Sequence, residues 1–301
     1  MSVVIEAHLP NICHRGKVRD TCDLGNAFLM VATDRLSAFD VVLPTGIPDK
    51  GAVLNQLSAF WFQKTAHIVP NHLIETVDDV TILEGYCPMG VCYVFPSYLA
   101  GRSMIVKKAQ RIDVECVVRG YLAGSAWAEY QEAGTVCGAS LPGGLRESEK
   151  LPQPIFTPAT KEASGHDINI SIEQMKKLVG DALAEEIIEK SQAVYSFADA
   201  YARSRGIIIA DTKMEFGLID GKLALIDELL TPDSSRFWNV SQYCPGQSQP
   251  SYDKQPVRDW LVASGWNKEP PAPTLPPEIV QQTTARYREA FYRLAGQELQ
   301  T

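Results

Sequence analysis

Residues 207–238 carry the sequence IIIADTKMEFGLIDGKLALIDELLTPDSSRFW, from which the fold can be worked outward. The apolar run Ile207–Ala210 predicts a strand. Beyond it Asp211, Lys213 and Glu215 alternate with uncharged residues at the two-residue period of a half-buried strand. We therefore expect these three charged side chains on one face of a sheet.

A hairpin is the expected continuation of this strand. Asp220-Gly221 is a strong turn signal, and Leu223–Leu230 predicts the returning strand. A two-residue turn would pair Glu215 with Ile226 and put Asp227 on the opposite face, whereas a three-residue loop with a glycine bulge would put Asp227 on the face of Glu215. We predict the three-residue loop.

The acids of this hairpin have two interpretations. Carboxylates brought together on a partly buried surface repel unless a cation neutralises them, and such hard oxygen ligands suit Mg²⁺. A surface salt-bridge ladder around Lys213 explains the same spacing equally well. The segment Thr231–Arg236 favours the metal, because it is polar, rich in turn residues and ends in a guanidinium suited to holding a phosphate or carboxylate.

Composition sets limits on the class of protein. The chain has 301 residues, of which 45% are hydrophobic and 21% charged, enough for two modest domains or one large one. A net charge of −8 argues against a nucleic-acid surface. We expect a cytoplasmic protein without membrane contact, since no signal sequence or long apolar run is seen. Seven cysteines without a C-x-x-C pair indicate free thiols rather than disulfides or zinc.

Apolar spacing and turn residues predict the remaining elements. Short strands are expected at Phe28–Ala32, Val91–Phe95, Ser103–Lys107 and Val114–Gly120. Helices are expected at Leu54–His67, Gly124–Gly134, Ile172–Arg205 with a break at Gly180, Gln255–Ser264 and Glu278–Leu294. Residues 138–169 are rich in proline and glycine and predict a long functional loop that ends near Lys161, His166 and Asp167.

Polar islands elsewhere are candidates for binding. Arg15–Asp20 places Gly16 between basic residues ahead of a strand, the layout of a loop whose backbone and lysine could cover nucleotide phosphates, although a solvated basic turn explains it too. Thr33–Asp40 interrupts an apolar run with polar side chains. Both islands lie in the first third of the chain.

A further island joins a strand to a helix. Glu115 and Arg119 share one face of their predicted strand, and Ser125 begins the following helix, where free N–H groups attract anions. A buried Glu–Arg ion pair is the structural alternative.

Six motifs, in this order, resemble those of the SAICAR synthetases of purine biosynthesis. They are GKVRD (16–20), TDRLSAFD (33–40), VECVVRGYLAGSAW (114–127), FTPATKEASGHDINIS (156–171), ADTKMEFG (210–217) and DELLTPDSSRFW (227–238). The resemblance covers residues from about 12 to 240 and is closest to the longer form of the family.

The resemblance implies an ATP-dependent ligase. That family condenses L-aspartate with carboxyaminoimidazole ribonucleotide through an acyl phosphate, giving SAICAR, ADP and phosphate in de novo purine biosynthesis. The expected partners are these small molecules and Mg²⁺, in a monomer or small homo-oligomer. A small-molecule kinase of related fold is the alternative, and a non-catalytic nucleotide-binding protein is a second; the absence of H-R-D and D-F-G strings counts against a protein kinase.

The resemblance also implies an α+β architecture. Residues 1–110 would form a small antiparallel domain like a kinase N-lobe, and residues 111–301 a larger ATP-grasp-like domain with the metal and substrate sites and the C-terminal helices. ATP would lie in the cleft between them.

Site residues follow from the motif matches. The phosphate-covering loop would comprise Gly16, Lys17, Val18 and Arg19. Lys107, which lies outside the six motifs, would be near the end of the strand that leads to the adenine pocket. Glu215 and Asp227 would hold Mg²⁺ at the ATP phosphates, and the catalytic residues would be Lys213, Asp211 and Lys161. Substrate binding would involve Asp34, Ser37, Glu115, Arg119, Ser125, Asp167 and Arg236.

Overall fold

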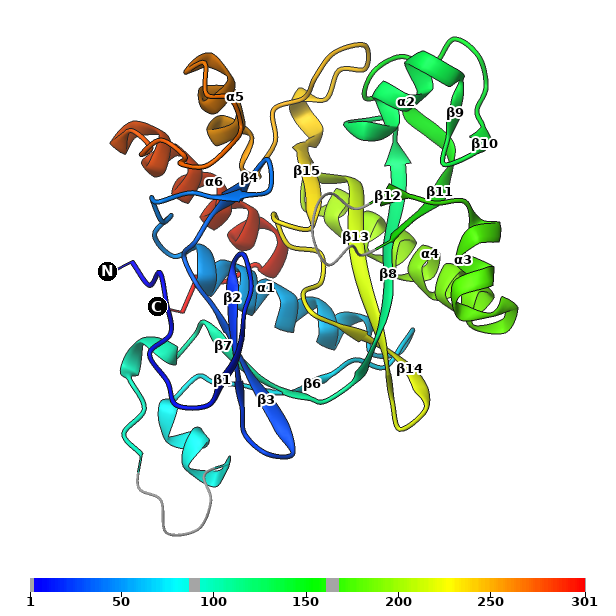
Figure 1. Ribbon diagram of the computed structural model, residues 1–301. Helices are drawn as coiled ribbons and strands as arrows, with labels where there is room; N and C mark the ends of the chain where they lie inside the picture. Colours follow the sequence, from blue (N-terminus) through cyan, green and yellow to red (C-terminus); the bar gives the residue numbers. More distant parts are fainter. Residues whose placement is uncertain (1–2, 87–92, 161–167, 301) are drawn as a thin grey trace. The chain divides into compact units, whose positions relative to one another are not determined.

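The computed structural model describes residues 3–86, 93–160 and 168–300. The protein is mixed α+β with antiparallel sheets and divides into two compact units. The first contains Met1–Gln63, His72–Lys108 and Asp253–Thr301, and the second contains Lys64–Asn71 and Ala109–Tyr252. Figure 1 shows the elements of both units.

A five-stranded antiparallel sheet forms the centre of the first unit. Its strands, in spatial order, are β1 (Ile12–Arg15), β2 (Arg19–Asp23), β3 (Ala27–Ala32), β7 (Ser103–Lys107) and β6 (Leu73–Thr76). Leu29, Val31 and Ile105 alternate toward one side, where they are fully buried with Leu83 and Leu99. This unit also contains the hairpin β4 (Ser37–Ala38) and β5 (Val41–Val42), most of helix α1 (Lys50–Thr65) and the 3₁₀ turns η1 (Val80–Tyr86) and η2 (Ser97–Leu99).

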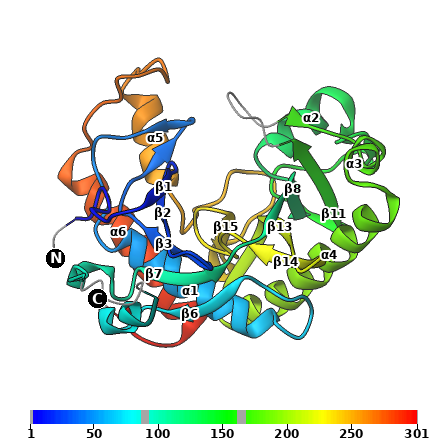
Figure 2. The same cartoon turned by 60° about the horizontal axis from the view of Figure 1, so that its bottom comes forward.

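The C-terminal helices group with this first unit, although the family resemblance implies that they belong to the larger domain at residues 111–301. Helix α5 (Gln255–Ala263) and helix α6 (Pro277–Ala295) lie beside the segment that contains β4 (Figure 2). Val257 and Leu261 of α5 are buried against Leu36 and Ile47. Burial of this apolar face places α5 and α6 with the first unit. The order of elements along the chain does not reveal this contact.

A six-stranded antiparallel sheet forms the centre of the second unit. Its order is β12 (Ile168–Asn169), β11 (Lys150–Thr160), β8 (Gln110–Tyr121), β13 (Ile207–Ile219) and β14 (Lys222–Ile226), with β15 (Ser235–Asn239) also paired to β13. The first half of β13 bonds to β15 and the second half to β14. Helix α2 (Ser125–Ala133), the hairpin β9 (Thr135–Val136) and β10 (Ala139–Ser140), and η3 (Val240–Gln242) complete this part of the unit.

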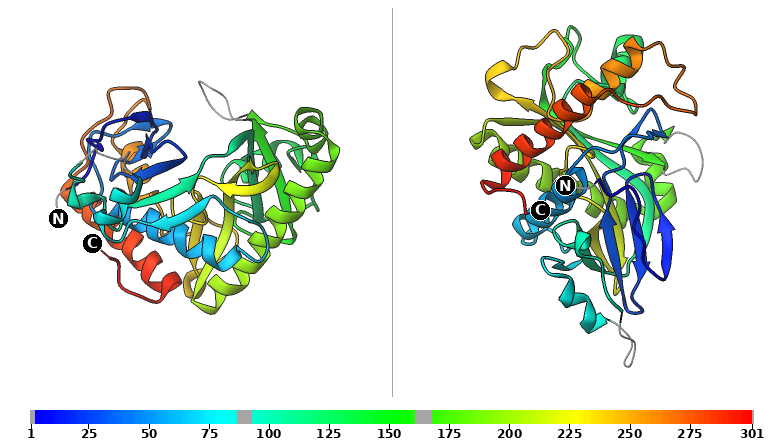
Figure 3. Two further views of the ribbon diagram at one scale, coloured as in Figure 1. Left: turned by 90° about the horizontal axis from the view of Figure 1, so that it is seen from below. Right: turned by 90° about the vertical axis from the view of Figure 1, so that its left-hand side faces the viewer.

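Helix α4 (Asp181–Ser204) covers one face of this sheet, together with the shorter helix α3 (Ile172–Val179) (Figure 3). The contact is close at Gly120, where an added Cβ would lie 1.9 Å from the hydroxyl oxygen of Tyr195. Residues of the same parity as Gly120 on β8 therefore face α4, and those of opposite parity face away. The side facing away carries the charged residues.

Most predicted elements are confirmed. The strands β3, β7 and β8 and the helices α1, α2, α5 and α6 all form, and Gly180 separates α3 from α4. Ser171 and Gln174 form a capping box at the start of α3. The strand predicted at Val91–Phe95 is wrong for residues 93–95, which form none, and residues 91–92 lie outside the described residues.

The long loop predicted at residues 138–169 is wrong, because it contains β11. Pro152, Pro154 and Pro158 hide this strand from a sequence pattern, since proline donates no hydrogen bond to a ladder. The strand tolerates them because, among the described residues, β12 pairs with Ala159 and Thr160 alone, and the pairing with β8 is interrupted between Lys150 and Ile155.

Candidate active site

Charged side chains collect on the face of the six-stranded sheet that points away from α4. The antiparallel register of β8 and β13 sets three pairs of neighbours: Glu115 opposite Glu215, Val117 opposite Lys213, and Arg119 opposite Asp211. Every second residue along each strand faces the same way, so five charged groups share this face. They divide into two clusters.

The first cluster holds two buried carboxylates around one ammonium. The Nζ of Lys213 lies 2.5 Å from Oε1 of Glu115 and 3.8 Å from Oε1 of Glu215. Both glutamates are 6% exposed. Burial of Lys213 opposes its charge, but the charges of Glu115, Glu215 and Asp227 outweigh it and raise the pKa of Lys213. Lys213 is therefore a cation at neutral pH.

The hairpin that carries Asp227 has a two-residue turn, so the predicted three-residue loop is wrong. Glu215 pairs with Ile226 and Ile219 with Lys222, leaving Asp220 and Gly221 as the turn. Their φ values of 51° and 74° match the left-handed backbone that tight hairpin turns require, which leaves no need for a third residue.

Asp227 nevertheless acts on the charged face. It follows the last residue of β14 and has a φ of 68°, which breaks the alternation of the strand. Its charge contributes to the raised pKa of Lys213. Asp227 therefore acts electrostatically on the first cluster, although the register of β14 would by itself turn its side chain to the opposite face.

The second cluster places two guanidinium groups on one carboxylate. Nη1 of Arg119 donates to Oδ2 of Asp211 at 3.1 Å, and Nη1 of Arg236 donates to the same oxygen. Burial lowers the pKa of Arg119, an effect that Asp211 offsets and Arg236 reinforces. Arginine still stays protonated, so the cluster keeps one positive charge in excess.

Neighbouring groups fix the direction of these guanidinium groups. Nε of Arg119 donates to Oγ1 of Thr157 at 3.0 Å, and its Nη2 lies 3.4 Å from Oγ of Ser125, the first residue of α2. An added Cβ at Gly124 would lie 2.3 Å from Nη2 of Arg236. Both arginines therefore form a positively charged group of hydrogen-bond donors beside the N-terminal N–H groups of α2.

The sequence model of the SAICAR synthetase family matches residues 12–273. The chain belongs to the SAICAR synthetase family. The resemblance drawn from the six motifs is thus confirmed. Phosphoribosylaminoimidazole-succinocarboxamide synthase of Thermodesulfovibrio yellowstonii is 53% identical over 292 residues, covering 96% of this chain and 98% of that protein. The corresponding protein of Desulforapulum autotrophicum is 51% identical over 298 residues, covering 98% and 99%.

Solved structures agree with this family. SAICAR synthase from Saccharomyces cerevisiae, in complex with SAICAR, is 44% identical with a TM-score of 0.88 and covers 98% of this chain and 99% of its own. A SAICAR synthetase in complex with ADP, 24% identical with a TM-score of 0.68, shares the fold.

SAICAR synthetases are ATP-dependent carbon–nitrogen ligases of purine biosynthesis, and the alternative of a small-molecule kinase is not favoured. No helix within the described ranges is long and apolar enough to cross a membrane. The cysteines that the structure describes, Cys13, Cys22, Cys116, Cys137 and Cys244, are free thiols as expected.

The loop expected to cover phosphates connects β1 to β2 in the first unit. The N–H of Gly16 donates to the carbonyl of Arg19 at 2.7 Å, and the carbonyl of Val18 accepts from the N–H of Thr33 at 3.0 Å. Lys17 is exposed and pairs with Asp40 at 2.6 Å. The loop is therefore closed on itself at its base, with its lysine on the surface.

Other expected ligand residues of the first unit have different surroundings. Lys107 is exposed at the end of β7, and Ser37 is buried in β4. Asp34 is fully buried and accepts the N–H of Val4 at 2.8 Å and of Gly51 at 2.9 Å. One of its oxygens also pairs with Nη1 of Arg102 at 3.0 Å, so the carboxylate is engaged within the protein. Lys161 and Asp167, with His166, lie outside the described residues.

The protein groups of the first cluster could provide only some of the ligands of a magnesium ion. No set of three or more His, Cys, Asp or Glu side chains in the described part of the chain is arranged to hold a metal. Mg²⁺ commonly takes one or two carboxylates and completes its shell with substrate phosphates and water. Glu215 and Asp227 would supply the carboxylates for such an ion. Three acids, Glu115, Glu215 and Asp227, against the ammonium of Lys213 give the cluster a formal charge of −2. This charge suits one divalent cation.

Two residues that adjoin the second cluster are not predicted from the sequence pattern. Thr157 was hidden by the assignment of its strand to a loop; strand alternation in FTPAT beside Arg119 is the signal that identifies it. Gly124 was noted only as the residue before a helix, and its steric role depends on Arg236, distant in sequence.

Proposed function

We propose that the charged face of β8 and β13 binds carboxyaminoimidazole ribonucleotide lengthwise, with its phosphate at the second cluster and its carboxylate at the first. The spacing supports this. Glu115 and Arg119 lie four residues apart on β8, as do Asp211 and Glu215 on β13, which corresponds to about 13 Å along an extended strand. A nucleoside monophosphate can bridge that span.

The second cluster is proposed to hold the substrate phosphate. Arg119 and Arg236 share one carboxylate and retain a positive charge, and Ser125 with the N-terminal N–H groups of α2 adds donors. Paired N–H groups of guanidinium match the oxygens of a phosphate. Asp211 and Thr157 orient the arginines rather than contact the anion, which Asp211 would repel.

The first cluster is proposed to hold Mg²⁺ and the ATP phosphates through Glu215 and Asp227. Bound there, the ion supplies charge neutralisation for the transferred phosphoryl group. Glu115 pairs with Lys213, and Lys213 faces the developing negative charge.

The chemistry proceeds through an acyl phosphate. An oxygen of the imidazole carboxylate bonds to the γ-phosphorus of ATP while the bond from that phosphorus to the β–γ bridging oxygen breaks, releasing ADP. The amine of aspartate then bonds to the acyl carbon, inorganic phosphate leaves, and the nitrogen loses a proton. Positioning and charge stabilisation account for most of such a reaction.

Lys213 acts in this scheme as a fixed cation. Its raised pKa means that it does not accept the proton of the aspartate amine at neutral pH. Lys161 and Asp167 are proposed to contact the carboxylates and amine of aspartate, as their motif implies.

The first unit is proposed to supply the nucleotide-binding loop in a sheet of the kinase N-lobe type, and the second an ATP-grasp-like sheet. Gly16, Lys17, Val18 and Arg19 would contact ATP phosphates, and Lys107 would lie near the adenine pocket. The five-stranded antiparallel sheet and the β1–β2 loop support this assignment. The buried contacts of Asp34 would hold Ser37 beside the substrates.

One assay tests the proposed function. The protein is mixed with ATP, Mg²⁺ and the ribonucleotide, with and without L-aspartate, while succinocarboxamide absorbance and ADP are followed. We expect absorbance only with aspartate, and stoichiometric ADP. Full ADP release without aspartate but with a hydroxyl acceptor would instead establish a kinase.

A further inference from the structure

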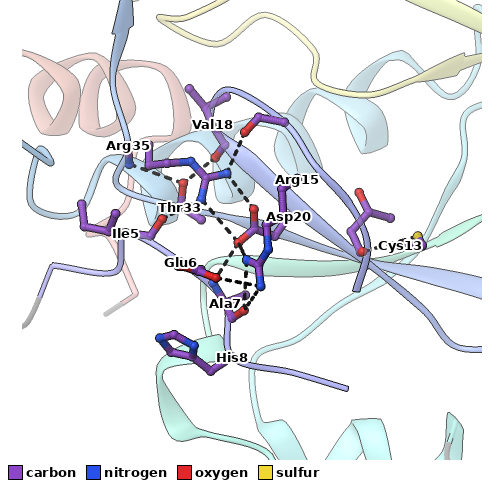
Figure 4. Close-up of polar contacts among 12 residues, drawn as sticks. Ile5, Glu6, Ala7, His8, Cys13, Arg15, Val18, Asp20, Thr33 and Arg35 are labelled. Atoms are coloured by element: carbon purple, nitrogen blue, oxygen red, sulfur yellow. Dashed lines mark hydrogen bonds and ion pairs between the residues drawn. The ribbon is translucent and has the colours of Figure 1, made fainter. Parts of the chain in front are cut away.

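A buried carboxylate in the first unit organises the loop between β1 and β2 (Figure 4). Asp20 is fully buried. It accepts from Nη1 of Arg15 at 3.0 Å, from Nη2 of Arg35 at 2.7 Å and from the N–H of Ala7 at 2.8 Å. Burying a carboxylate is costly unless it is paired and hydrogen-bonded, so these contacts fix both arginines in place.

Arg35 uses its remaining donors on backbone carbonyl groups. Its Nη2 donates to the carbonyl of Gly16 at 2.9 Å, its Nε to that of Lys17 at 3.3 Å, and its Nη1 to that of Ile5 at 2.6 Å. The side chain is 11% exposed. A guanidinium has five donors in a rigid plane, and here it ties two successive peptide groups of the loop to Asp20.

The direction of these carbonyls sets the direction of two amides. In a trans peptide the C=O of one residue and the N–H of the next point in opposite directions. With the carbonyls of Gly16 and Lys17 turned toward Arg35, the N–H groups of Lys17 and Val18 point away from it. No hydrogen bond from either N–H to another group is found within residues 3–86, 93–160 and 168–300. Successive N–H groups with a common direction form a concavity that binds anions.

We infer that Arg35, held by Asp20, is a positioning residue that aims the N–H groups of Lys17 and Val18 at the phosphates of a nucleoside triphosphate. This inference rests on the proposed role of the β1–β2 loop. It assigns phosphate recognition to two backbone amides, and it gives Arg35 a function that involves no contact with the nucleotide.

Arg15 provides a matched control. It also pairs with Asp20, but its other contacts are the carbonyl of Ala7 and the carboxylate of Glu6, and none is with the loop carbonyls. Arg15→Gln and Arg35→Gln therefore each remove one partner of the same buried carboxylate. Only Arg35→Gln releases the peptide groups of Gly16 and Lys17.

The test compares wild type, Arg35→Gln, Arg35→Lys and Arg15→Gln, with folding checked by circular dichroism and thermal unfolding. We expect Arg35→Gln to raise KM for ATP and Kd for ADP about tenfold. This is roughly the effect of losing one hydrogen bond from a loop N–H to a charged phosphate oxygen. The KM values for aspartate and the ribonucleotide should change less than about twofold, as should KM for ATP in Arg15→Gln.

Arg35→Lys guards against a folding defect. Lysine keeps a positive charge beside Asp20 but cannot donate hydrogen bonds to all three carbonyl groups that Arg35 contacts. We therefore expect a native melting profile with a raised KM for ATP. An unchanged KM for ATP in folded Arg35→Lys and Arg35→Gln would overturn the inference, as would an equal rise in Arg15→Gln.

A second readout does not depend on the proposed function. Limited trypsin digestion should cut after Lys17 faster in Arg35→Gln than in Arg15→Gln. Only the first variant removes the hydrogen bonds that hold the carbonyl groups of Gly16 and Lys17. If wild type binds no ATP while this difference in cleavage is found, the proposed function fails and the tie between Arg35 and the loop stands. Equal cleavage in the two variants contradicts the positioning role itself.

Discussion

Gly124 and Arg236 occupy adjoining space: a Cβ at Gly124 would lie 2.3 Å from Nη2 of the arginine. These residues are distant in sequence, yet the start of α2 and strand β15 bring them together. The guanidinium thus lies directly against the peptide backbone, where the first N–H groups of a helix favour an anion.

Gly124→Ala should therefore raise KM for the ribonucleotide by at least about tenfold, since Arg236 must move, while KM for ATP changes little. Gly134→Ala is the control at the other end of α2. Gly134 also has a positive φ, 67°, but an added Cβ there meets nothing within 4 Å. Equal ribonucleotide KM values in the two variants would contradict the steric role.

Lys213→Met should leave the carboxylates of Glu115 and Glu215 without their cation. We expect the free energy of unfolding to fall by about 2 kcal/mol, less than for a fully buried pair because the side chain of Lys213 is 35% exposed. Adding Glu115→Gln should recover at least half of this loss in urea titrations without restoring turnover. Failure of the second change to recover stability would show that the two charges are not coupled.

The same lysine predicts a pH dependence. A cation whose folded pKa exceeds its unfolded pKa adds stability that is complete below the unfolded value, near pH 10.4 for lysine, and is lost only as pH rises through the folded value. The difference in unfolding free energy between wild type and Lys213→Met should thus be constant from about pH 6 to about pH 9. A difference that shrinks across this range would place the pKa of Lys213 too low for a permanent cation.

Asp227→Asn should lower kcat about a hundredfold or more and shift the Mg²⁺ dependence to higher concentration, because one proposed ligand charge is lost. Asparagine tolerates the left-handed backbone at this position, so the fold should persist. Asp220→Asn, with φ of 51° in the same hairpin, is the matched control and should retain activity and Mg²⁺ dependence. Near-normal turnover in Asp227→Asn would remove its metal role.

Gly221→Ala should lower the free energy of unfolding by about 1 kcal/mol, since the turn requires a φ of 74° there. Turnover should be unchanged because the turn is at the far end of the hairpin from Asp211. Gly143→Ala, in open space and without a positive φ, should have little effect in the same denaturant titration. Stability equal to wild type in Gly221→Ala would contradict the two-residue turn.

Sequence patterns located the charged face because it depends on local alternation. Asp211, Lys213 and Glu215 share a face in any regular strand, and the caps of α2 and α3 are determined by adjacent residues. The strand β11 was missed because an irregular pairing tolerates its prolines, and this is a property of the sheet and not of the segment.

Contacts between distant segments explain the other differences. Either turn length agreed with the sequence of the hairpin, and the backbone at Asp220 and Gly221 decided between them. The packing of α5 on Leu36 and Ile47 could not be read from chain order. The role of Arg35 depends on three segments that meet only in the folded unit.

Strand β13 contributes to both clusters while bonding to β8, β14 and β15. Deleting or inserting one residue between Asp211 and Glu215 would turn part of this set toward α4 and separate the two clusters at once. We therefore expect variants with an insertion or deletion in this part of β13 to be inactive. Variants with residues inserted at the turn beside Asp220 should keep their activity. The hairpin therefore combines a segment whose length the two clusters fix with an exposed turn where added residues would disturb neither cluster.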